Sequence, residues 1–147
     1  MLLEVKLLDI PKLKDIIERN IASCNVGDRT SFEYVKSTAT LFSQAGDLAA
    51  WTDSLEDPHL ILIVTKGKFG VLNETIAFIN TLYIDEGYQN SSRIQEMVTT
   101  AELWAKGQGC DCITGSSWVF RGSKDISTLW ENLGYQVQEK LYVKGLK

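Results

Sequence analysis

Residues 82–110 read "LYIDEGYQNSSRIQEMVTTAELWAKGQGC" and place a strand, a short polar turn and a helix one after another. The stretch opens with β-prone residues. From Ile94 onward the apolar residues recur at the spacing of one helix face, and Gly107 and Gly109 end this pattern. A helix start leaves amide N–H groups without partners and carries the positive end of the helix dipole. The order of elements therefore makes this turn a candidate anion site.

The turn contains small and hydrogen-bonding residues instead of the glycines that usually let a phosphate approach the backbone. Ser91 and Ser92 are small and carry hydroxyl donors, while Gln89, Asn90 and Arg93 add further donors. Two interpretations stay open from these residues alone. The turn binds a phosphate, or Ser92 simply caps the helix and Arg93 is solvated.

The N-terminal half predicts a strand, two helices and three further strands. These are a strand at 2–8, a helix at about 9–23, a second helix that begins near residue 30, and strands at 47–53, 60–66 and 74–85. Thr30 and Glu33 form a capping box for the second helix, and Gly46 marks its end. Its apolar stripe consists of Phe32, Val35, Ala39 and Phe42. The turn-prone segment 67–73 predicts an antiparallel connection between the last two strands.

The C-terminal half continues with a helix, a strand, a helix and a strand. The helix that starts at about Ser92 has an apolar face made of Ile94, Met97, Val98, Ala101, Trp104 and Ala105. A strand is expected at 110–118, then a short helix from Ser123 to Leu133 that Gly134 ends, and a final strand at 135–146. The chain therefore predicts a mixed α/β sheet flanked by helices, in one domain over residues 1–147.

The amino-acid composition limits the classes of protein to which the chain can belong. The chain has 147 residues, 44% hydrophobic and 23% charged, which fits one globular domain. The formal charge of −4 and the lack of a lysine or arginine cluster argue against binding to nucleic acid. No apolar run is long enough to cross a bilayer, and no signal peptide is readable. A soluble, cytoplasmic protein without membrane contact is expected.

Neither a metal site nor a disulfide framework is expected. The three cysteines are an odd count, and Cys110 and Cys112 have no second cysteine pair to complete a ligand set. Their spacing predicts that both share a buried face of a strand. His59 is the one histidine, and its place after "EDP" predicts a solvated loop residue.

Residues 82–110 resemble the strand, pyrophosphate loop and helix of the GNAT superfamily of acetyl-CoA-dependent N-acetyltransferases. The loop of that family is usually written Q/R-x-x-G-x-G/A. Gln89 takes the first place of this motif, Ser92 stands at the first glycine and Ile94 at the second, so only Gln89 matches. Further on, "STLWENLGYQVQEKLYVKGL" resembles the closing helix, the "LGY" turn and the last strand of the family. The element order is similar over the whole chain, whereas the specific motifs cover residues 80–146.

The resemblance implies acetyl-CoA as the co-substrate. Its pantetheine would bind main-chain groups of Leu82 and Ile84 along the splayed edge of the "INTLYID" strand. Its pyrophosphate would rest on the amides from Gln89 to Ile94, which include those of Asn90, Ser91, Ser92 and Arg93.

The resemblance also implies where catalytic groups should lie, and this chain departs from the family there. Trp130 stands where the family often has a tyrosine that protonates the departing thiolate, and an indole N–H is no useful acid. The strand 76–84 has no carboxylate to act as a base, which leaves Asn80 as a residue that could order a water. Tyr83 is an alternative proton donor or a packing residue. Ser117 could line the acceptor cleft or belong to a turn.

Three alternative functions are compatible with these sequence features. The first is an N-acetyltransferase that acts on an unidentified amine of a small molecule or protein. The second is an inactive GNAT-like structural or interaction module, with a protein assembly partner or as a homodimer. The Ser-Arg pair of the loop and the "LYVKGL" end are similar to bacteriophage acetyltransferase-like proteins, which would place such a module in a virion or the host cytoplasm. The third is a regulatory protein that binds a CoA-like ligand without turnover. Exposed tryptophans would favour the interaction module.

Overall fold

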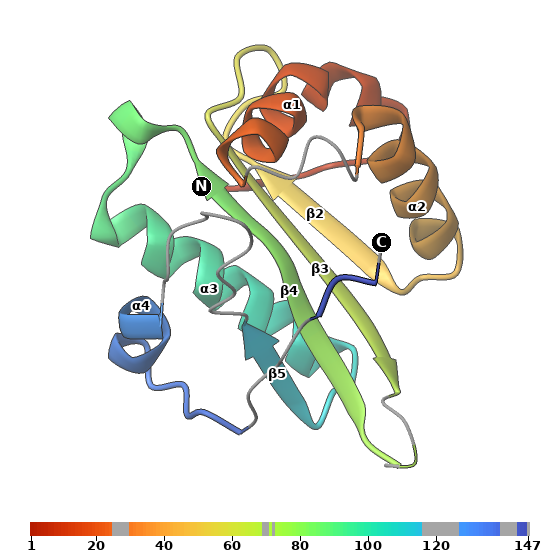
Figure 1. Cartoon of the computed structure of the whole chain (residues 1–147), viewed down its shortest axis with the longest axis vertical. Coiled ribbons are helices and arrows are strands. Elements are labelled where there is room, and N and C mark those ends of the chain that lie inside the picture. Colours follow the sequence, from red (N-terminus) through yellow and green to blue (C-terminus); the bar gives the residue numbers. More distant parts are fainter. Residues whose placement is uncertain (25–29, 69–70, 72, 116–126, 139–143, 147) are drawn as a thin grey trace.

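A computed structural model describes residues 1–24, 30–68, 71, 73–115, 127–138 and 144–146. The strands are β1 (Leu3–Glu4), β2 (Leu48–Thr52), β3 (Leu60–Lys68), β4 (Thr75–Ile84) and β5 (Cys112–Gly115). The α-helices are α1 (Lys14–Ser23), α2 (Phe32–Gln44), α3 (Ser91–Gly107) and α4 (Ser127–Asn132), with 3-10 helices η1 (Leu7–Leu13) and η2 (Glu86–Tyr88). Figure 1 shows the helices arranged around the sheet. The mixed α/β architecture expected from the sequence is confirmed.

The five strands form one sheet in the order β1-β2-β3-β4-β5. Neighbours are antiparallel up to β4, and β5 then runs parallel to β4 after the crossover through α3. A parallel pair needs such a long connection, because two parallel strands cannot be joined by a tight turn. The crossover brings the N-terminus of α3 close to the end of β4, where the chain leaves the sheet.

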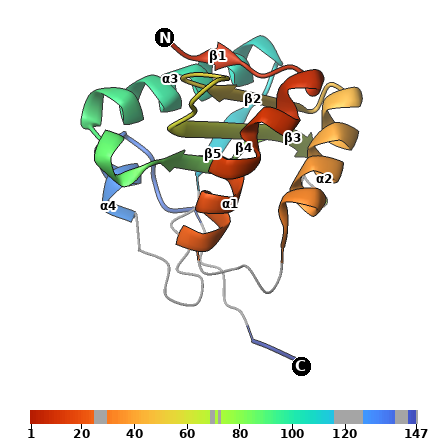
Figure 2. The same cartoon turned by 90° about the horizontal axis from the view of Figure 1, so that it is seen from above.

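Helices cover both faces of the sheet, with α1 and α2 on one face and α3 on the other (Figure 2). Alternation along β3 supplies both cores, since successive strand residues point to opposite faces. Leu60, Leu62 and Val64 pack in the α3-side core, whereas Ile61 packs with Leu13, Ile16, Ile17 and Phe32 in the α1-side core. Both layers bury apolar surface, which is the main source of their stability.

The start of the chain differs from the prediction. Leu3 and Glu4 pair with β2, the Val5 amide donates to the Ala50 carbonyl, and the chain then turns into η1 instead of extending the strand to residue 8. Pro11 lies inside η1, where its fixed φ is compatible with a helical turn. This turn carries Leu13 into the α1-side core and leaves Leu8 91% exposed. The helix predicted from about residue 9 is therefore a 3-10 turn followed by α1.

The second helix is confirmed, but its cap is Ser31 and not Thr30. The Ser31 Oγ accepts a hydrogen bond of 3.3 Å from the Tyr34 amide, and the Ser31 backbone is extended, as a cap requires. Phe42 is 42% exposed, so the apolar stripe ends before it. Gly46 has φ +76° and ends the helix as predicted.

The C-terminal elements are confirmed in part. Gly134 follows α4 after Leu133 and has φ +85°, as expected for a helix-terminating glycine. Ser123, the predicted cap of α4, lies outside the described residues. Residues 135–138 are not a strand, which contradicts the prediction there, and 139–143 lie outside the described part.

The expected burial of both cysteines is wrong for Cys112, which is exposed at the start of β5. Cys110 is half-buried and packs on the α3-side core. It precedes β5, and its amide donates to the Ala105 carbonyl in the turn that ends α3. Strand alternation therefore does not apply to this pair. Among the described residues, no group of three metal-ligating side chains occurs, and no helix is long and apolar enough to span a membrane.

Candidate cofactor site at the end of β4 and the start of α3

A bulge at Asn80 decides which side chains of β4 face which core. Ile63 of β3 opposes Thr81, whereas the next residue, Val64, opposes Ile79, so Asn80 is an extra residue in β4. The extra residue reverses the alternation of the side chains. Ala77, Ile79, Leu82 and Ile84 consequently all lie on the α3-side core, and Tyr83 lies on the α1 side.

Beyond the bulge, one edge of β4, called the open edge, is unpaired within the described residues. The pairing with β5 covers Ile76 to Ile79, and no described strand pairs with β4 beyond that point on this side. The Asp85 amide donates to the His59 carbonyl on the β3 side, at 2.8 Å. Because strand peptides alternate in direction, the N–H and C=O groups of Leu82 and Ile84 then point toward the open edge. These are the two residues for which the family resemblance implies contact with pantetheine.

Gln89 binds this open edge directly. Its side-chain Nε2 donates to the Ile84 carbonyl at 3.1 Å. The contact ties the turn after β4 back to the strand. This hydrogen bond uses one lone pair of the Ile84 carbonyl oxygen, which lies where pantetheine is expected to bind. The same oxygen has a second lone pair that can accept from another donor.

Asn90 caps α3. Its Oδ1 accepts from the Arg93 amide at 2.8 Å, and its carbonyl accepts from the Ile94 amide at 3.2 Å. The interpretation of Ser92 as the cap is therefore wrong, because Ser92 is already the second residue of the helix.

Three of the predicted pyrophosphate amides remain open. Within the described residues, the amides of Asn90, Ser91 and Ser92 have no hydrogen-bond partner. Ser91 and Ser92 are exposed, and both lie at the positive end of a helix of 17 residues. Such a group of open amides is the arrangement that favours an anion.

Arg93 is held close to the turn and is not simply solvated. Its side chain is half-buried, and Nη1 donates to the Tyr88 carbonyl at 3.2 Å. Its guanidinium carbon lies 5.4 Å from the centre of the Tyr88 ring, within the range of a cation–π contact. The positive charge therefore stays beside the start of α3.

A polar cluster that the sequence did not predict lies at the end of β4, around Asp85. Arg19 of α1 donates to both Asp85 oxygens, at 2.9 and 2.8 Å, and also to the Pro58 carbonyl. The Tyr83 hydroxyl donates to Asp85 at 3.0 Å. Hydrogen bonds from Arg19 above all, with those from His59 and Tyr83, lower the pKa of Asp85. Burial, together with the bond to Asp85, raises the pKa of Tyr83.

The prediction of a solvated His59 is wrong. The ring is only 20% exposed and lies between two carboxylates, with Nδ1 3.0 Å from Asp85 and Nε2 3.1 Å from Asp57. It also stacks on Tyr88, with ring centres 3.7 Å apart and planes 8° from parallel. The only sequence signals for this cluster are "EDPH" and "YIDEGY", whose charged and aromatic residues stand at two neighbouring strand ends.

The three predicted catalytic residues lie in different surroundings. Asn80 is exposed at the bulge, and its Nδ2 donates to the Thr65 hydroxyl and to the Phe78 carbonyl. Tyr83 is half-buried, with its hydroxyl on Asp85. Ser117 lies outside the described residues.

Trp130 is a core residue. It is 6% exposed in the α3-side core, and its ring packs on Tyr135 at 5.1 Å between centres. Tyr135 in turn donates to Glu102, and burial raises its pKa. Trp51 is also buried, so neither Trp51 nor Trp130 is the exposed tryptophan that would favour an interaction module. Trp118 lies outside the described residues.

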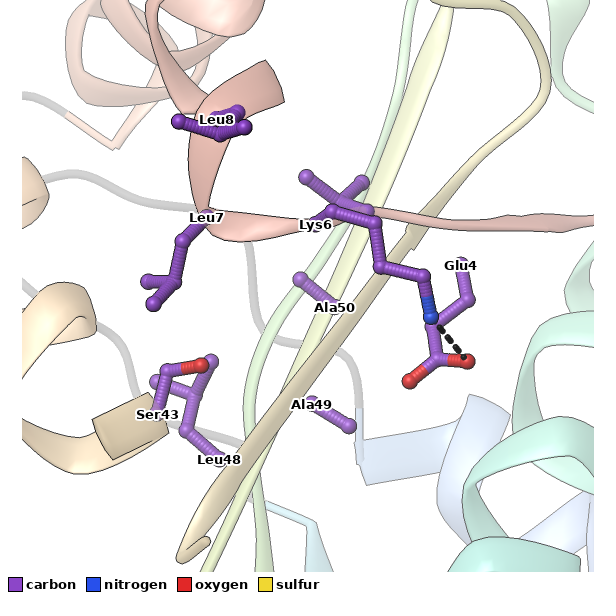
Figure 3. Close-up of a pocket in the computed structure, with 9 residues that line it drawn as sticks. Glu4, Lys6, Leu7, Leu8, Ser43, Leu48, Ala49 and Ala50 are labelled. Carbon is purple, nitrogen blue, oxygen red and sulfur yellow. Dashed lines mark hydrogen bonds and ion pairs between the residues drawn. The ribbon is translucent and has the colours of Figure 1, made fainter. Parts of the chain in front are cut away.

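A separate hollow of about 360 Å³ lies at the opposite edge of the sheet. It is formed where β1 and η1 meet β2 and the end of α2, with Leu7 and Ser43 facing across it (Figure 3). Glu4 and Lys6 form an exposed ion pair at its rim, at 3.1 Å. β3 lies between β2, which lines the hollow, and β4, so the hollow is not part of the site at β4 and α3.

Comparison with solved structures shows the same fold in known acetyltransferases. A predicted acetyltransferase from Clostridium acetobutylicum, solved with acetyl-CoA, has a TM-score of 0.81 at 12% identity, covering 99% of this chain and 96% of that chain. An aminoglycoside N-acetyltransferase solved with CoA has a TM-score of 0.76 at 9% identity, covering 99% and 93%. Glucosamine-6-phosphate N-acetyltransferase from Arabidopsis thaliana has a TM-score of 0.73 at 14% identity, covering 100% and 98%.

The chain has the fold of the GNAT acetyltransferases, with its five-stranded mixed sheet between helices. No protein-family model matches the sequence, and no curated protein matches it. At such low identity the likeness establishes the fold, and function has to be argued from the site.

Proposed function

We propose that the protein binds acetyl-CoA along the open edge of β4 and at the N-terminus of α3, and transfers the acetyl group to an amine. The observation that carries this proposal is that a strand edge with free main-chain groups and a set of open amides at a helix start lie next to each other. Within the described residues, the main-chain groups of Leu82 and Ile84 lie on an unpaired strand edge, and the open amides of Asn90, Ser91 and Ser92 follow within a few residues. The first suits the amides of pantetheine, and the second suits the pyrophosphate.

The fold supports acetyl-CoA as the co-substrate, because similar structures include one solved with acetyl-CoA and one solved with CoA. Other proteins with this fold act on aminoglycosides and on glucosamine-6-phosphate, both of which carry amines. The acceptor proposed here is accordingly an amine of a small molecule or a protein.

The chemistry needs few side chains. A neutral amine attacks the thioester carbonyl and forms the N–C bond of the amide, the C–S bond breaks, and the proton that the nitrogen gives up neutralises the departing thiolate. Holding the two reactants together supplies much of the rate enhancement in such a transfer. We propose Asn80, Tyr83 and Ser117 as the groups to test for proton transfer and water ordering, because Trp130 is buried at the usual acid position.

The test is calorimetric titration with acetyl-CoA, followed by an assay for free thiol. We expect binding in the micromolar range. Ser92→Glu should weaken binding at least tenfold because it places a negative charge beside the pyrophosphate. The same change should leave the fold intact, since an acidic residue at a helix start is favourable. Ser92→Gln is the matched neutral control and should bind close to wild type.

The outcomes separate the candidate functions. Binding with thiol release upon addition of amines supports the enzyme. Binding without release under any amine tested supports a regulatory protein that binds a CoA-like ligand. Absence of binding at millimolar acetyl-CoA would overturn the cofactor site and leave the fold as a structural or interaction module.

A further inference from the structure

His59 makes two hydrogen bonds that a neutral imidazole cannot make together. Its two ring nitrogens face carboxylate oxygens of Asp85 and Asp57, at 3.0 and 3.1 Å. An ionised carboxylate only accepts, and a neutral imidazole has one N–H and one acceptor nitrogen. Both contacts are favourable at once only when His59 is the imidazolium cation, which has two N–H donors. The geometry therefore matches a charged histidine.

The charges around His59 favour the same form. Asp53 Oδ1 accepts from the His59 amide at 2.9 Å, so three carboxylates surround this residue. Arg19 is the cation on the other side of Asp85, and Tyr83 binds Asp85 through its hydroxyl. Hydrogen bonding to Asp85, followed by that to Asp57, raises the pKa of His59 above its ordinary value of 6.5, against the effect of burial.

The same histidine contacts the turn that leads to the candidate pyrophosphate site. The His59 carbonyl accepts from the Asp85 amide at 2.8 Å, and its ring stacks on Tyr88. The Tyr88 amide donates to the Asp85 carbonyl at 2.8 Å, which closes the turn on itself. Arg93, in the first turn of α3, reaches back to the Tyr88 carbonyl. His59 therefore touches both ends of residues 85–88, just before α3 begins.

We propose that protonated His59 is a positioning residue for acetyl-CoA: it holds residues 85–88, and through Tyr88 and Arg93 the start of α3, in the arrangement that receives the pyrophosphate. This inference rests on the proposed function. His59 does not touch the reacting atoms and takes no part in the transfer itself. Loss of its proton leaves one ring nitrogen lone pair facing the carboxylate of Asp85 or Asp57, so one of the two contacts that hold the ring becomes repulsive and its hold on the turn weakens.

The sign of the pH dependence follows from the raised pKa. A histidine whose pKa is raised by its native partners stabilises the arrangement fully below 6.5, and this contribution is lost as pH rises through the raised pKa. We expect acetyl-CoA to bind about fivefold more weakly above that range than below it, a typical size for coupling between two sites. By reciprocity, saturating acetyl-CoA should raise the pKa of His59 further.

The pKa of His59 can be followed directly because it is the sole histidine of the chain. The experiment records its ring carbon–proton NMR signals against pH, in the free protein and with saturating acetyl-CoA, beside calorimetric titrations at matched pH. Asp57→Asn replaces one acceptor with a side chain that can donate, so a neutral imidazole then satisfies both partners. We expect this variant to have a lower His59 pKa and to bind acetyl-CoA with much less dependence on pH.

Glu56→Gln is the matched control. It removes one negative charge from the residue next to Asp57 and leaves both partners of the His59 ring, Asp85 and Asp57, in place. It should retain the pH dependence of the wild type. A His59 pKa that stays the same when acetyl-CoA binds, or equal pH profiles for Asp57→Asn and the wild type, would refute the positioning role while leaving the cofactor site standing. A protein that binds no acetyl-CoA at any pH removes the proposed function, and this inference falls with it.

Discussion

The indole ring of Trp130 lies directly against the backbone of Gly115. A Cβ placed on Gly115 would come within 2.5 Å of the ring carbon Cζ2 and 2.6 Å of two more ring atoms. Gly115 is the last residue of β5 and stands opposite Ile79, next to the bulge in β4. The contact therefore joins α4 to the point where β4 and β5 stop pairing. The ring of Trp130 is 6% exposed in this position.

Gly115→Ala should destabilise the protein, because Trp130 has to move out of a packed core. Overpacking of this kind lowers the free energy of unfolding by about 1 to 3 kcal/mol. Thermal unfolding measures the effect. Gly67→Ala in β3 is the control, since an added Cβ there meets nothing within 4 Å. Equal melting temperatures for the two variants would contradict the contact, and Trp130→Leu combined with Gly115→Ala should recover part of the loss.

Gly134→Ala should destabilise the protein through backbone strain alone. Gly134 has φ +85°, and an added Cβ would meet nothing within 4 Å, so no steric clash contributes. A residue with a Cβ loses about 1 to 2 kcal/mol in the left-handed region. Gly134→Asn should lose less, because asparagine tolerates this conformation. Chemical denaturation compares the two, and equal losses would show that backbone strain is not the cause.

Asn90→Ala should destabilise α3, whereas Ser92→Ala should have little effect on stability. The Asn90 side chain accepts from the Arg93 amide, and losing a cap costs about 1 kcal/mol. The Ser92 side chain has no hydrogen-bond partner within the described residues. Urea denaturation of both variants checks the assignment. A larger loss for Ser92→Ala would place the cap at Ser92 instead.

Asp85 should make the protein sensitive to acid. Its pKa is lowered, chiefly by Arg19, so its stabilisation is present above its ordinary value of 3.8 and is lost as pH falls through the lower native value. Asp85→Asn should reduce the free energy of unfolding by about 1 to 2 kcal/mol at pH 7, since Arg19 is partly exposed. The difference from wild type should shrink below pH 3.8. A gap that stays constant down to pH 2 would rule out this linkage.

The sequence predicted the fold well because most of its signals are local. The 3.6-residue spacing of Met97, Val98, Ala101 and Ala105 gave α3, and all four are buried. The alternation and turn signals between 60 and 85 gave an antiparallel pair of strands. Element boundaries were less accurate, as at η1, because a short strand and a 3-10 turn use similar apolar residues.

The candidate site was predicted only where it depends on local sequence. The family resemblance singled out Leu82 and Ile84, whose main-chain groups point away from β3, and the local order of strand, turn and helix singled out the amides before α3; the role of both in binding stays a prediction. The cap was assigned to the wrong residue, since asparagine and serine both suit that position and lie two residues apart.

The sequence by itself determined the order of the elements, the apolar faces and the helix start with its small residues, because these depend on neighbours within about one or two turns of chain. The tertiary structure decided the rest. Arg19 and Asp85 are 66 residues apart in the chain, and His59 and Asp85 are 26 apart, so no local pattern brings them together. The bulge at Asn80, which sets the direction of Leu82 and Tyr83, exists only because β3 and β4 pair in a particular register. Hydrogen bonds and packing between distant segments fix both features, and they form only when the sheet and its helices come together.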